Sequence, residues 1–151
     1  MNGVEIKIKF LENNKEQKLP FYATSGAAGM DLTACLDESI TLKPLERALI
    51  PTGIAISLPS EKYGAFLFAR SGLASKHGIT LANCVGVVDS DYTGEIKVAL
   101  VNLSNNEYTI ENGERIAQMV IMEVAKASFT ITDELDKTQR GSGGFGSTGN
   151  K

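Results

Sequence analysis

The sequence predicts an all-β domain built as a sandwich, a jelly roll or a barrel. Short apolar runs recur at close intervals, and prolines or glycine-containing turns separate them. Apolar and charged residues alternate from Val4 to Phe10, which is the period of a half-buried strand. A stretch with the apolar spacing of a long amphipathic helix is absent from the sequence.

Prolines and turn residues separate the expected strands along the chain. The run after Pro20 holds Asp31 inside an apolar, glycine-bounded strand, and Pro44 separates the next two runs. Pro59 precedes a strand that ends before a segment, Ser71 to His77, expected to form one or two helical turns. The turn Asn112-Gly113 precedes the last long apolar run. The expected strands span 4–10, 28–32, 40–42, 48–58, 63–68, 79–88, 95–103, 115–124 and 128–132.

The chain divides at one point only. No repeat of 20 to 50 residues and no internal linker is visible, so residues 1–136 form one predicted β domain. Residues 137–151 are rich in glycine and have little to bury, which predicts a flexible tail. Arg140 and Phe145 stand alone among glycines and hydroxyls there, which indicates a segment that orders over a ligand and closes an active site.

Composition excludes several classes of function. The 151 residues carry a net charge of −3, too little positive charge for a nucleic-acid partner. The start of the chain has no apolar signal core or spanning segment, and Cys35 and Cys84 are expected to be buried thiols in a reducing compartment. We therefore expect a cytoplasmic protein without membrane contact. His77 is the only histidine, which argues against histidine triads and His-rich metal centres.

The segment Gly86 to Glu95 is the first candidate for chemistry. An apolar strand enters a turn with Asp89, Asp91 and Tyr92, and an apolar strand follows, so the segment is expected to form a hairpin. Aspartates in turns usually bond to backbone N–H groups, which is the structural alternative. At the edge of a core, however, such a carboxylate can orient and deprotonate a water.

The segment Ala69 to Gly78 is the second candidate. Arg70, Ser71 and Lys76 lie among glycines after an apolar strand, and guanidinium and hydroxyl groups suit phosphates. The alternative is a solvated basic loop. His77 is expected to be a loop or packing histidine.

Two further polar residues lie inside apolar strands. Asp31 is expected to be hydrogen-bonded in the core or to contribute to a metal or water network. Gln118 interrupts the run 116–122 and needs a partner, either a backbone carbonyl or a ligand.

Taken together, these blocks resemble the homotrimeric dUTPase family. Its five ordered motifs match residues 28–32, 70–79, 86–94, 113–120 and 140–149, in the right order and spacing. The resemblance implies a jelly-roll-like (β-clip) fold and three active sites shared by three subunits. It also implies hydrolysis of dUTP to dUMP and pyrophosphate by Mg²⁺-assisted water attack on the α-phosphate. That activity limits uracil incorporation into DNA and supplies dUMP for dTTP synthesis.

The resemblance also implies roles for individual residues. Asp89 would activate the water, Tyr92 would exclude a 2′-hydroxyl, and Asn83 would read the uracil edge. Asp31 would touch the water shell of the metal or support the Asp89 network, and no protein group would bind the metal directly. The remaining expected substrate-binding residues are Arg70, Ser71, Gly72, Val88, Gln118, Arg140, Phe145, Gly146, Ser147 and Thr148.

The sequence leaves two alternative functions open and raises one question about the distance between Asn83 and Asp89. A dCTP deaminase would share the fold, and a non-catalytic nucleotide-binding module would not need Asp89. A straight strand would place Asn83 and Asp89 roughly 20 Å apart, so both can touch one nucleoside only if the strand bulges or curls. We expect the bulge at Gly86.

Overall fold

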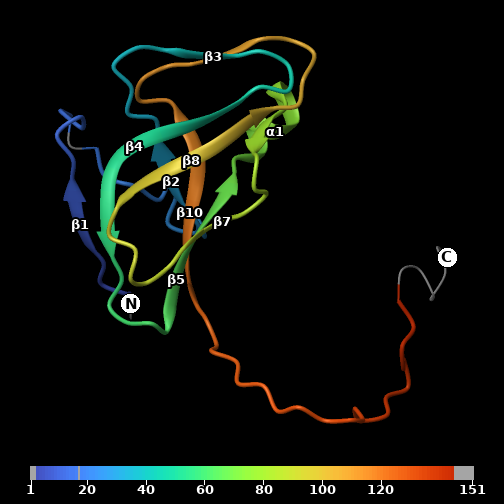
Figure 1. Cartoon of the computed structure of the whole chain (residues 1–151). Helices are drawn as coiled ribbons and strands as arrows, with labels where there is room; N and C mark the ends of the chain where they lie inside the picture. The colour runs from blue at the N-terminus through green and yellow to red at the C-terminus, as the bar shows by residue number, and fades with distance from the viewer. Residues whose placement is uncertain (1–2, 17, 145–151) are drawn as a thin grey trace.

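The computed structural model describes residues 3–16 and 18–144. Antiparallel strands dominate, with one short helix among the described residues (Figure 1). The elements in order are β1 Lys7–Phe10, β2 Met30–Thr33, β3 Ile40–Leu42, β4 Arg47–Ser57, β5 Tyr63–Ala69, α1 Ser71–His77, β6 Ile79–Leu81, β7 Gly86–Val88, β8 Glu95–Asn102, β9 Tyr108–Ile110 and β10 Arg115–Glu123.

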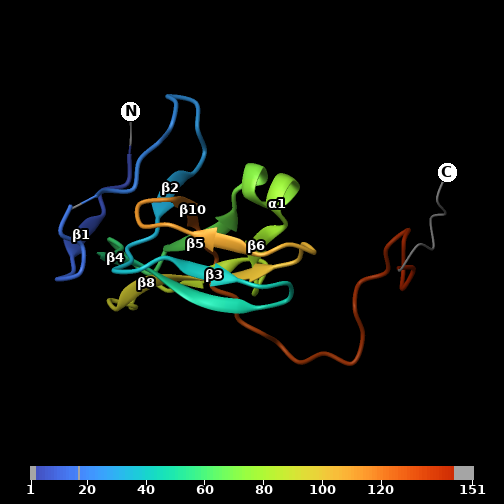
Figure 2. The same cartoon turned by 90° about the horizontal axis from the view of Figure 1, so that it is seen from above.

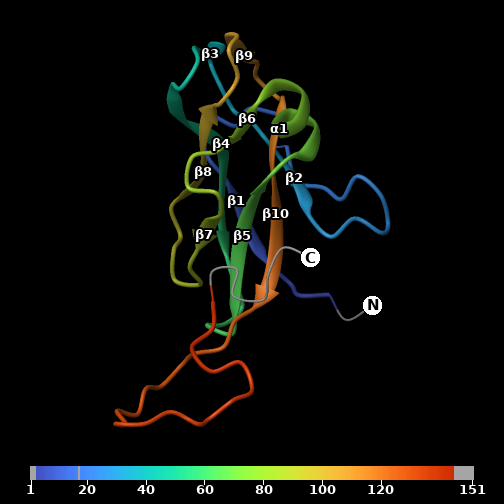
Figure 3. The same cartoon turned by 90° about the vertical axis from the view of Figure 1, so that its right-hand side faces the viewer.

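Two four-stranded sheets pack face to face and form the body of the fold. One has the order β1-β4-β8-β6 and the other β2-β10-β5-β7. Figure 3 shows the two layers edge on, with the small β3-β9 sheet at one end. Both layers supply the core, which includes Ile50 and Val98 from the first sheet and Leu67 and Met119 from the second. The prediction of a jelly-roll-like all-β fold is confirmed.

The long strand β4 is bent where its sequence changes from apolar to turn-forming residues. Pro51 has no N–H group, and the pairing with β8 shifts register between Pro51 and Ala55. Gly53 lies at φ +67°, and a Cβ there would come within 2.6 Å of the Asn14 side chain and 2.8 Å of the Cys35 sulfur. Because only glycine fits this space and this backbone angle, Gly53 allows the loop at Asn14 to pack against β4.

The run 79–88 forms two strands rather than the single expected strand. β6 pairs with β8 in one sheet, and β7 pairs with β5 in the other, so the chain changes sheets between them. The break lies at residues 82–85, where Cys84 adopts φ +61° and its N–H donates to the Leu81 carbonyl. The expected curl is present, but the prediction of its position at Gly86 was wrong. Gly86 instead lies close to β5, where an added Cβ would be 3.0 Å from the Leu67 Cβ.

The same sheet change corrects a second prediction. β7 and β8 are consecutive strands but belong to different sheets, so residues 86–95 do not form a hairpin. They form a corner, in which the Tyr92 N–H donates to the Asp89 carbonyl at 3.2 Å.

Beyond β10 the chain leaves the sheets as an extended arm. Its last backbone bond to the body runs from the Val124 N–H to the Lys62 carbonyl. Figure 2 shows the arm continuing away from both layers. The strand predicted at 128–132 is wrong, because residues 124–132 contain no strand, and β9 was missed. Among the described residues, no helix is long and apolar enough to cross a membrane.

Candidate active site

Asp89 lies at the exit of β7, between two clefts. The register Ala65↔Val88 places it beside the beginning of β5. One cleft, of about 200 Å³, is lined by Leu67, Asn83, Gly86, Val87, Val88, Asp89, Tyr92 and Lys97. The other, of about 440 Å³, includes Gly64, Phe66, Asp89 and Val124. The change of sheets at 82–85 therefore brings Asn83 to the same cleft as Asp89, which resolves the tension posed by a straight strand.

The Asp89 side chain is available for chemistry. It is exposed, and no described residue donates a hydrogen bond to its carboxylate. The turn is held by the backbone carbonyl of Asp89, so the carboxylate is not used as a turn-forming acceptor. This geometry favours a functional role over the structural alternative.

Tyr92 lines the first cleft together with Asn83. Its hydroxyl donates to the Glu95 carbonyl at 2.9 Å, which fixes the ring across the corner. The ring is 47% exposed, and a Cβ at Gly94 would come within 2.6 Å of its hydroxyl. Gly94 thus provides the space in which Tyr92 lies.

A second cluster surrounds Asp31, which is only 2% exposed. Its Oδ1 accepts from Arg70 Nε at 3.1 Å, and its Oδ2 accepts from Arg115 Nη1 at 3.0 Å. Gln118 Nε2 also donates to Oδ1, at 3.4 Å. Two guanidinium groups and one carboxylate leave a net charge of +1 beside donors that face solvent, a suitable environment for phosphate.

Arg70, Ser71 and Gly72 connect this cluster to α1. Arg70 is extended, and Ser71 and Gly72 are exposed in the first turn of the helix. The helix ends at His77, where Gly78 at φ +69° donates its N–H to the Ala74 carbonyl. The expected one or two helical turns at 71–77 are confirmed.

Asp89 and the arginine cluster lie at opposite ends of β5. Asp89 follows Val88, which pairs with Ala65, whereas Arg70 follows the other end of the strand. The six residue steps from Gly64 to Arg70 span roughly 20 Å in an extended strand. A single chain therefore does not bring Arg70, Ser71 and Gln118 to the cleft of Asn83, Asp89 and Tyr92.

Arg140 belongs to the arm that follows β10, and its Nε donates to the Gly143 carbonyl at 2.8 Å. The predictions for Phe145, Gly146, Ser147 and Thr148 lie outside the described residues.

Comparisons with known proteins identify the family of this chain. A family model described as dUTPase matches residues 15–149. The chain belongs to the dUTPase family.

Individual relatives extend the match over almost the whole chain. The deoxyuridine 5′-triphosphate nucleotidohydrolase of Desulfitobacterium hafniense (strain DSM 10664 / DCB-2) is 54% identical over 149 residues, covering 99% of each chain. That of Neisseria meningitidis serogroup A is 51% identical over 147 residues, 97% of this chain and 98% of the relative. Among solved structures, the Staphylococcus bacteriophage 80alpha dUTPase with dUPNHPP has a TM-score of 0.85 at 29% identity, covering 96% of this chain and 98% of that chain. As a dUTPase, the protein hydrolyses dUTP to dUMP.

Arg115 is a residue of this dUTPase for which the sequence alone indicated no role. It lies on β10, and 46% of its side chain is exposed beside the buried Asp31. A buried carboxylate in an apolar strand requires cationic partners, which is the signal that could have identified Arg115.

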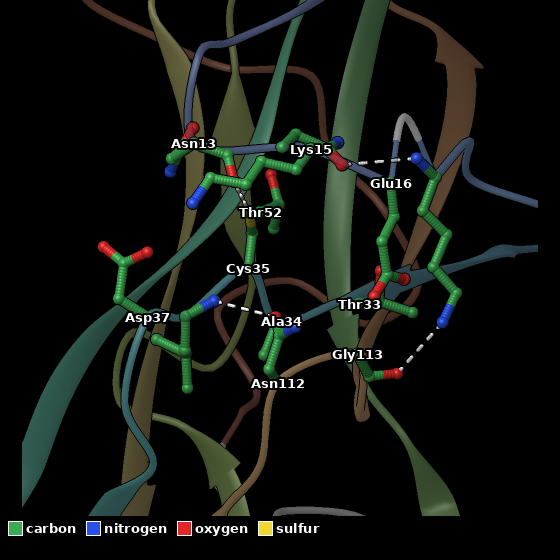
Figure 4. A pocket seen from close by; sticks show the side chains of 13 residues that line it. Asn13, Lys15, Glu16, Thr33, Ala34, Cys35, Asp37, Thr52, Asn112 and Gly113 are labelled. Atoms are coloured by element: carbon green, nitrogen blue, oxygen red, sulfur yellow. Dashed lines mark hydrogen bonds between the residues drawn. The ribbon is translucent and has the colours of Figure 1, made fainter.

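A polar cavity of about 250 Å³ lies apart from both clusters (Figure 4). Asn13, Cys35 and Asn112 are among its lining residues, and the Cys35 thiol donates to the Asn13 carbonyl. Burial raises the pKa of the Cys35 thiol, and the nearby Glu95, Asp37 and Glu16 raise it further. No residue predicted for the dUTPase site lines this cavity.

Proposed function

We propose that this dUTPase acts by water attack on the α-phosphorus of Mg²⁺-bound dUTP, with Asp89 as the catalytic base. The attacking water gives its proton to the Asp89 carboxylate as the new P–O bond forms. The bond between the α-phosphorus and the bridging oxygen breaks, and pyrophosphate leaves with those electrons. The observation that supports this most strongly is the free, exposed carboxylate of Asp89 in the cleft of Asn83 and Tyr92.

The cleft beside Asp89 supports recognition of deoxyuridine. Asn83 offers an amide that can donate to and accept from the uracil edge, and Val88 borders the same space. Tyr92 stands where the sugar would pack, so a 2′-hydroxyl would collide with its ring. A nucleobase with the reverse donor pattern would leave the Asn83 amide unpaired, which disfavours cytosine.

The triphosphate would be held by residues of more than one copy. Arg70, Ser71, Gly72 and Gln118 are the proposed phosphate-binding residues, but Arg70 is roughly 20 Å from Asp89 along β5. A homotrimer with shared sites supplies these residues from a neighbouring copy. The arm would supply Arg140, Phe145, Gly146, Ser147 and Thr148 as the segment that closes over the nucleotide.

Magnesium would arrive with the nucleotide. When bound there, Mg²⁺ offsets the negative charge of the phosphate oxygens during attack. Among the described residues, no group of three or more His, Cys, Asp or Glu side chains could hold a metal ion. Asp31 is buried and already accepts from Arg70 and Arg115, so it fits a role in holding these arginines better than contact with the metal's water shell. Both cysteines are free thiols, which fits the expected reducing, cytosolic environment. The prediction that both are buried was wrong, because Cys84 is exposed and Cys35 is only partly buried.

The direct test is pyrophosphate release from dUTP, UTP, dCTP and dTTP, each assayed with Mg²⁺ and with a chelator. We expect Mg²⁺-dependent turnover of dUTP and little turnover of the other three. Equal turnover of all four would contradict the proposed roles of Asn83 and Tyr92. Ammonia release from dCTP would indicate deaminase chemistry instead.

The role of Asp89 is tested by Asp89→Asn, which keeps the shape of the side chain but cannot accept the proton. We expect kcat to fall about a thousandfold while dUTP still binds. Asp37→Asn makes the same change at an exposed aspartate outside the cleft and is the matched control. Near-normal turnover of Asp89→Asn would remove Asp89 from its proposed role.

A further inference from the structure

Tyr108 contacts both His77 and Glu114, and none of the three has a part in the chemistry proposed above. The Tyr108 hydroxyl, from β9, donates to Glu114 Oε1 at the entry to β10. The His77 ring, at the end of α1, lies against the Tyr108 ring with centroids 5.1 Å apart and planes at 53°. Glu114 is itself held, because its Oε2 accepts from the Glu111 N–H at 3.1 Å.

These contacts anchor one end of the segment that carries Arg70, Ser71 and Gly72. The other end is anchored by Arg70, whose Nη1 donates to the Arg115 carbonyl at 3.1 Å and whose Nε binds Asp31. Glu114 directly precedes Arg115, so both ends of the segment 70–77 are attached to the same short stretch of chain. Figures 1 and 3 both place α1 beside the β3-β9 end of the fold.

We propose that Tyr108 is a positioning residue for phosphate binding. It holds the end of α1, through His77, against Glu114 and the start of β10. Arg70, Ser71 and Gly72 are thereby kept in fixed relation to Gln118, which β10 also carries. The proposal rests on the assignment of these residues to phosphate in the proposed function.

The raised pKa of Tyr108 indicates that its hydrogen bond to Glu114 persists at neutral pH. The pKa of Tyr108 is raised to about 12, mainly by burial and also by the hydrogen bond to Glu114 and the charge of Glu114, while the charge of Arg70 opposes the shift. The phenol therefore keeps its proton at neutral pH and remains a donor to Glu114. His77 is also too far from Asp89 of the same chain to exchange a proton with it, because α1 follows the far end of β5.

Tyr108→Phe tests the proposal, because it removes the hydroxyl and keeps the ring beside His77. Tyr22→Phe, at an exposed loop tyrosine, is the matched control. Inhibition of dUTP hydrolysis by Mg²⁺-pyrophosphate probes the phosphate-binding residues alone, and inhibition by deoxyuridine probes the nucleoside cleft alone. We expect about fivefold weaker inhibition by pyrophosphate in Tyr108→Phe, with unchanged inhibition by deoxyuridine.

His77 supplies a second, exposed position for the test. His77→Phe keeps an aromatic ring for Tyr108 and should retain pyrophosphate inhibition, whereas His77→Leu should weaken it as Tyr108→Phe does. Unchanged pyrophosphate inhibition in Tyr108→Phe and His77→Leu would overturn the proposal, as would an equal loss of both inhibitors. Arg70→Ala distinguishes failure of the proposed function from failure of the role of Tyr108. If Arg70→Ala leaves pyrophosphate inhibition intact, this segment does not bind phosphate, and the proposed function is wrong on that point.

Discussion

Asp31 determines how two arginines can act together. Unpaired, the guanidinium groups of Arg70 and Arg115 would repel each other, but one buried carboxylate between them holds both. Each guanidinium has five N–H donors, so donors remain for an anion beyond those that bind Asp31 and the Arg115 carbonyl. The buried Asp31 therefore fixes the positions of both arginines in the proposed phosphate-binding cluster.

The raised pKa of Tyr108 predicts a pH dependence of folding stability. In the unfolded chain the phenol loses its proton near its ordinary pKa of about 10, whereas the folded protein retains it up to a pKa of about 12. The stabilisation by this group is therefore fully present below about pH 10 and is lost as the pH rises toward 12. We expect the thermal unfolding midpoint of the wild type to fall more steeply across this range than that of Tyr108→Phe. Parallel pH profiles for the two proteins would contradict a raised pKa at Tyr108.

At the scale of elements, the corner between β7 and β8 positions Tyr92, the residue proposed to exclude a 2′-hydroxyl. Gly94→Ala places a Cβ that would be 2.6 Å from the Tyr92 hydroxyl, so the ring must move away from the Glu95 carbonyl. We expect the ratio of kcat/KM for dUTP to that for UTP to fall by about tenfold. Gly26→Ala, where an added Cβ meets nothing within 4 Å, is the control. An unchanged ratio in Gly94→Ala would show that Tyr92 does not exclude the 2′-hydroxyl.

Strands that are continuous in both sequence pattern and pairing could be predicted well. The expected range 48–58 corresponds to β4, and 115–124 corresponds to β10, each within a residue of the observed bounds. The two strands within residues 79–88 could not be predicted, because apolar periodicity does not reveal which sheet a strand joins. The left-handed backbone conformation of Cys84, where the chain changes sheets, also has no sequence signal. Residues 128–132 alternate like a strand, yet the described part of the chain offers them no pairing partner.

In the candidate site, too, local features could be predicted from the sequence, whereas contacts between distant residues could not. Asp89 and Tyr92 are close in sequence, and the motif at residues 86–94 that contains them could be recognised from the residues alone. Arg115 and Asp31 are 84 positions apart, so their ion pair depends on the antiparallel pairing of β2 with β10. Long-range partners of this kind become visible only when the sheet register is known.

The arm determines how the whole molecule would assemble. Phe129 is 93% exposed and Ile131 is 99% exposed, although both are large apolar side chains. A run of such residues on an extended segment is typical of a surface that another chain covers. The separation of Asp89 from Arg70 along β5 supports the same inference, because the proposed water-activating group and the proposed phosphate cluster lie apart within one copy.

Two truncations test the arm and the tail separately. Deleting residues 140–151 removes Arg140 and the glycine-rich end but keeps Phe129 and Ile131, so we expect a folded trimer with almost no turnover. Deleting residues 126–151 also removes the exposed apolar side chains, and we expect the assembly to dissociate as the covered surface is lost. Light scattering gives the mass of each variant, circular dichroism its fold, and pyrophosphate release its activity. Full activity without residues 140–151 would exclude the tail from the site, and a trimer without residues 126–151 would show that the arm does not hold the copies together.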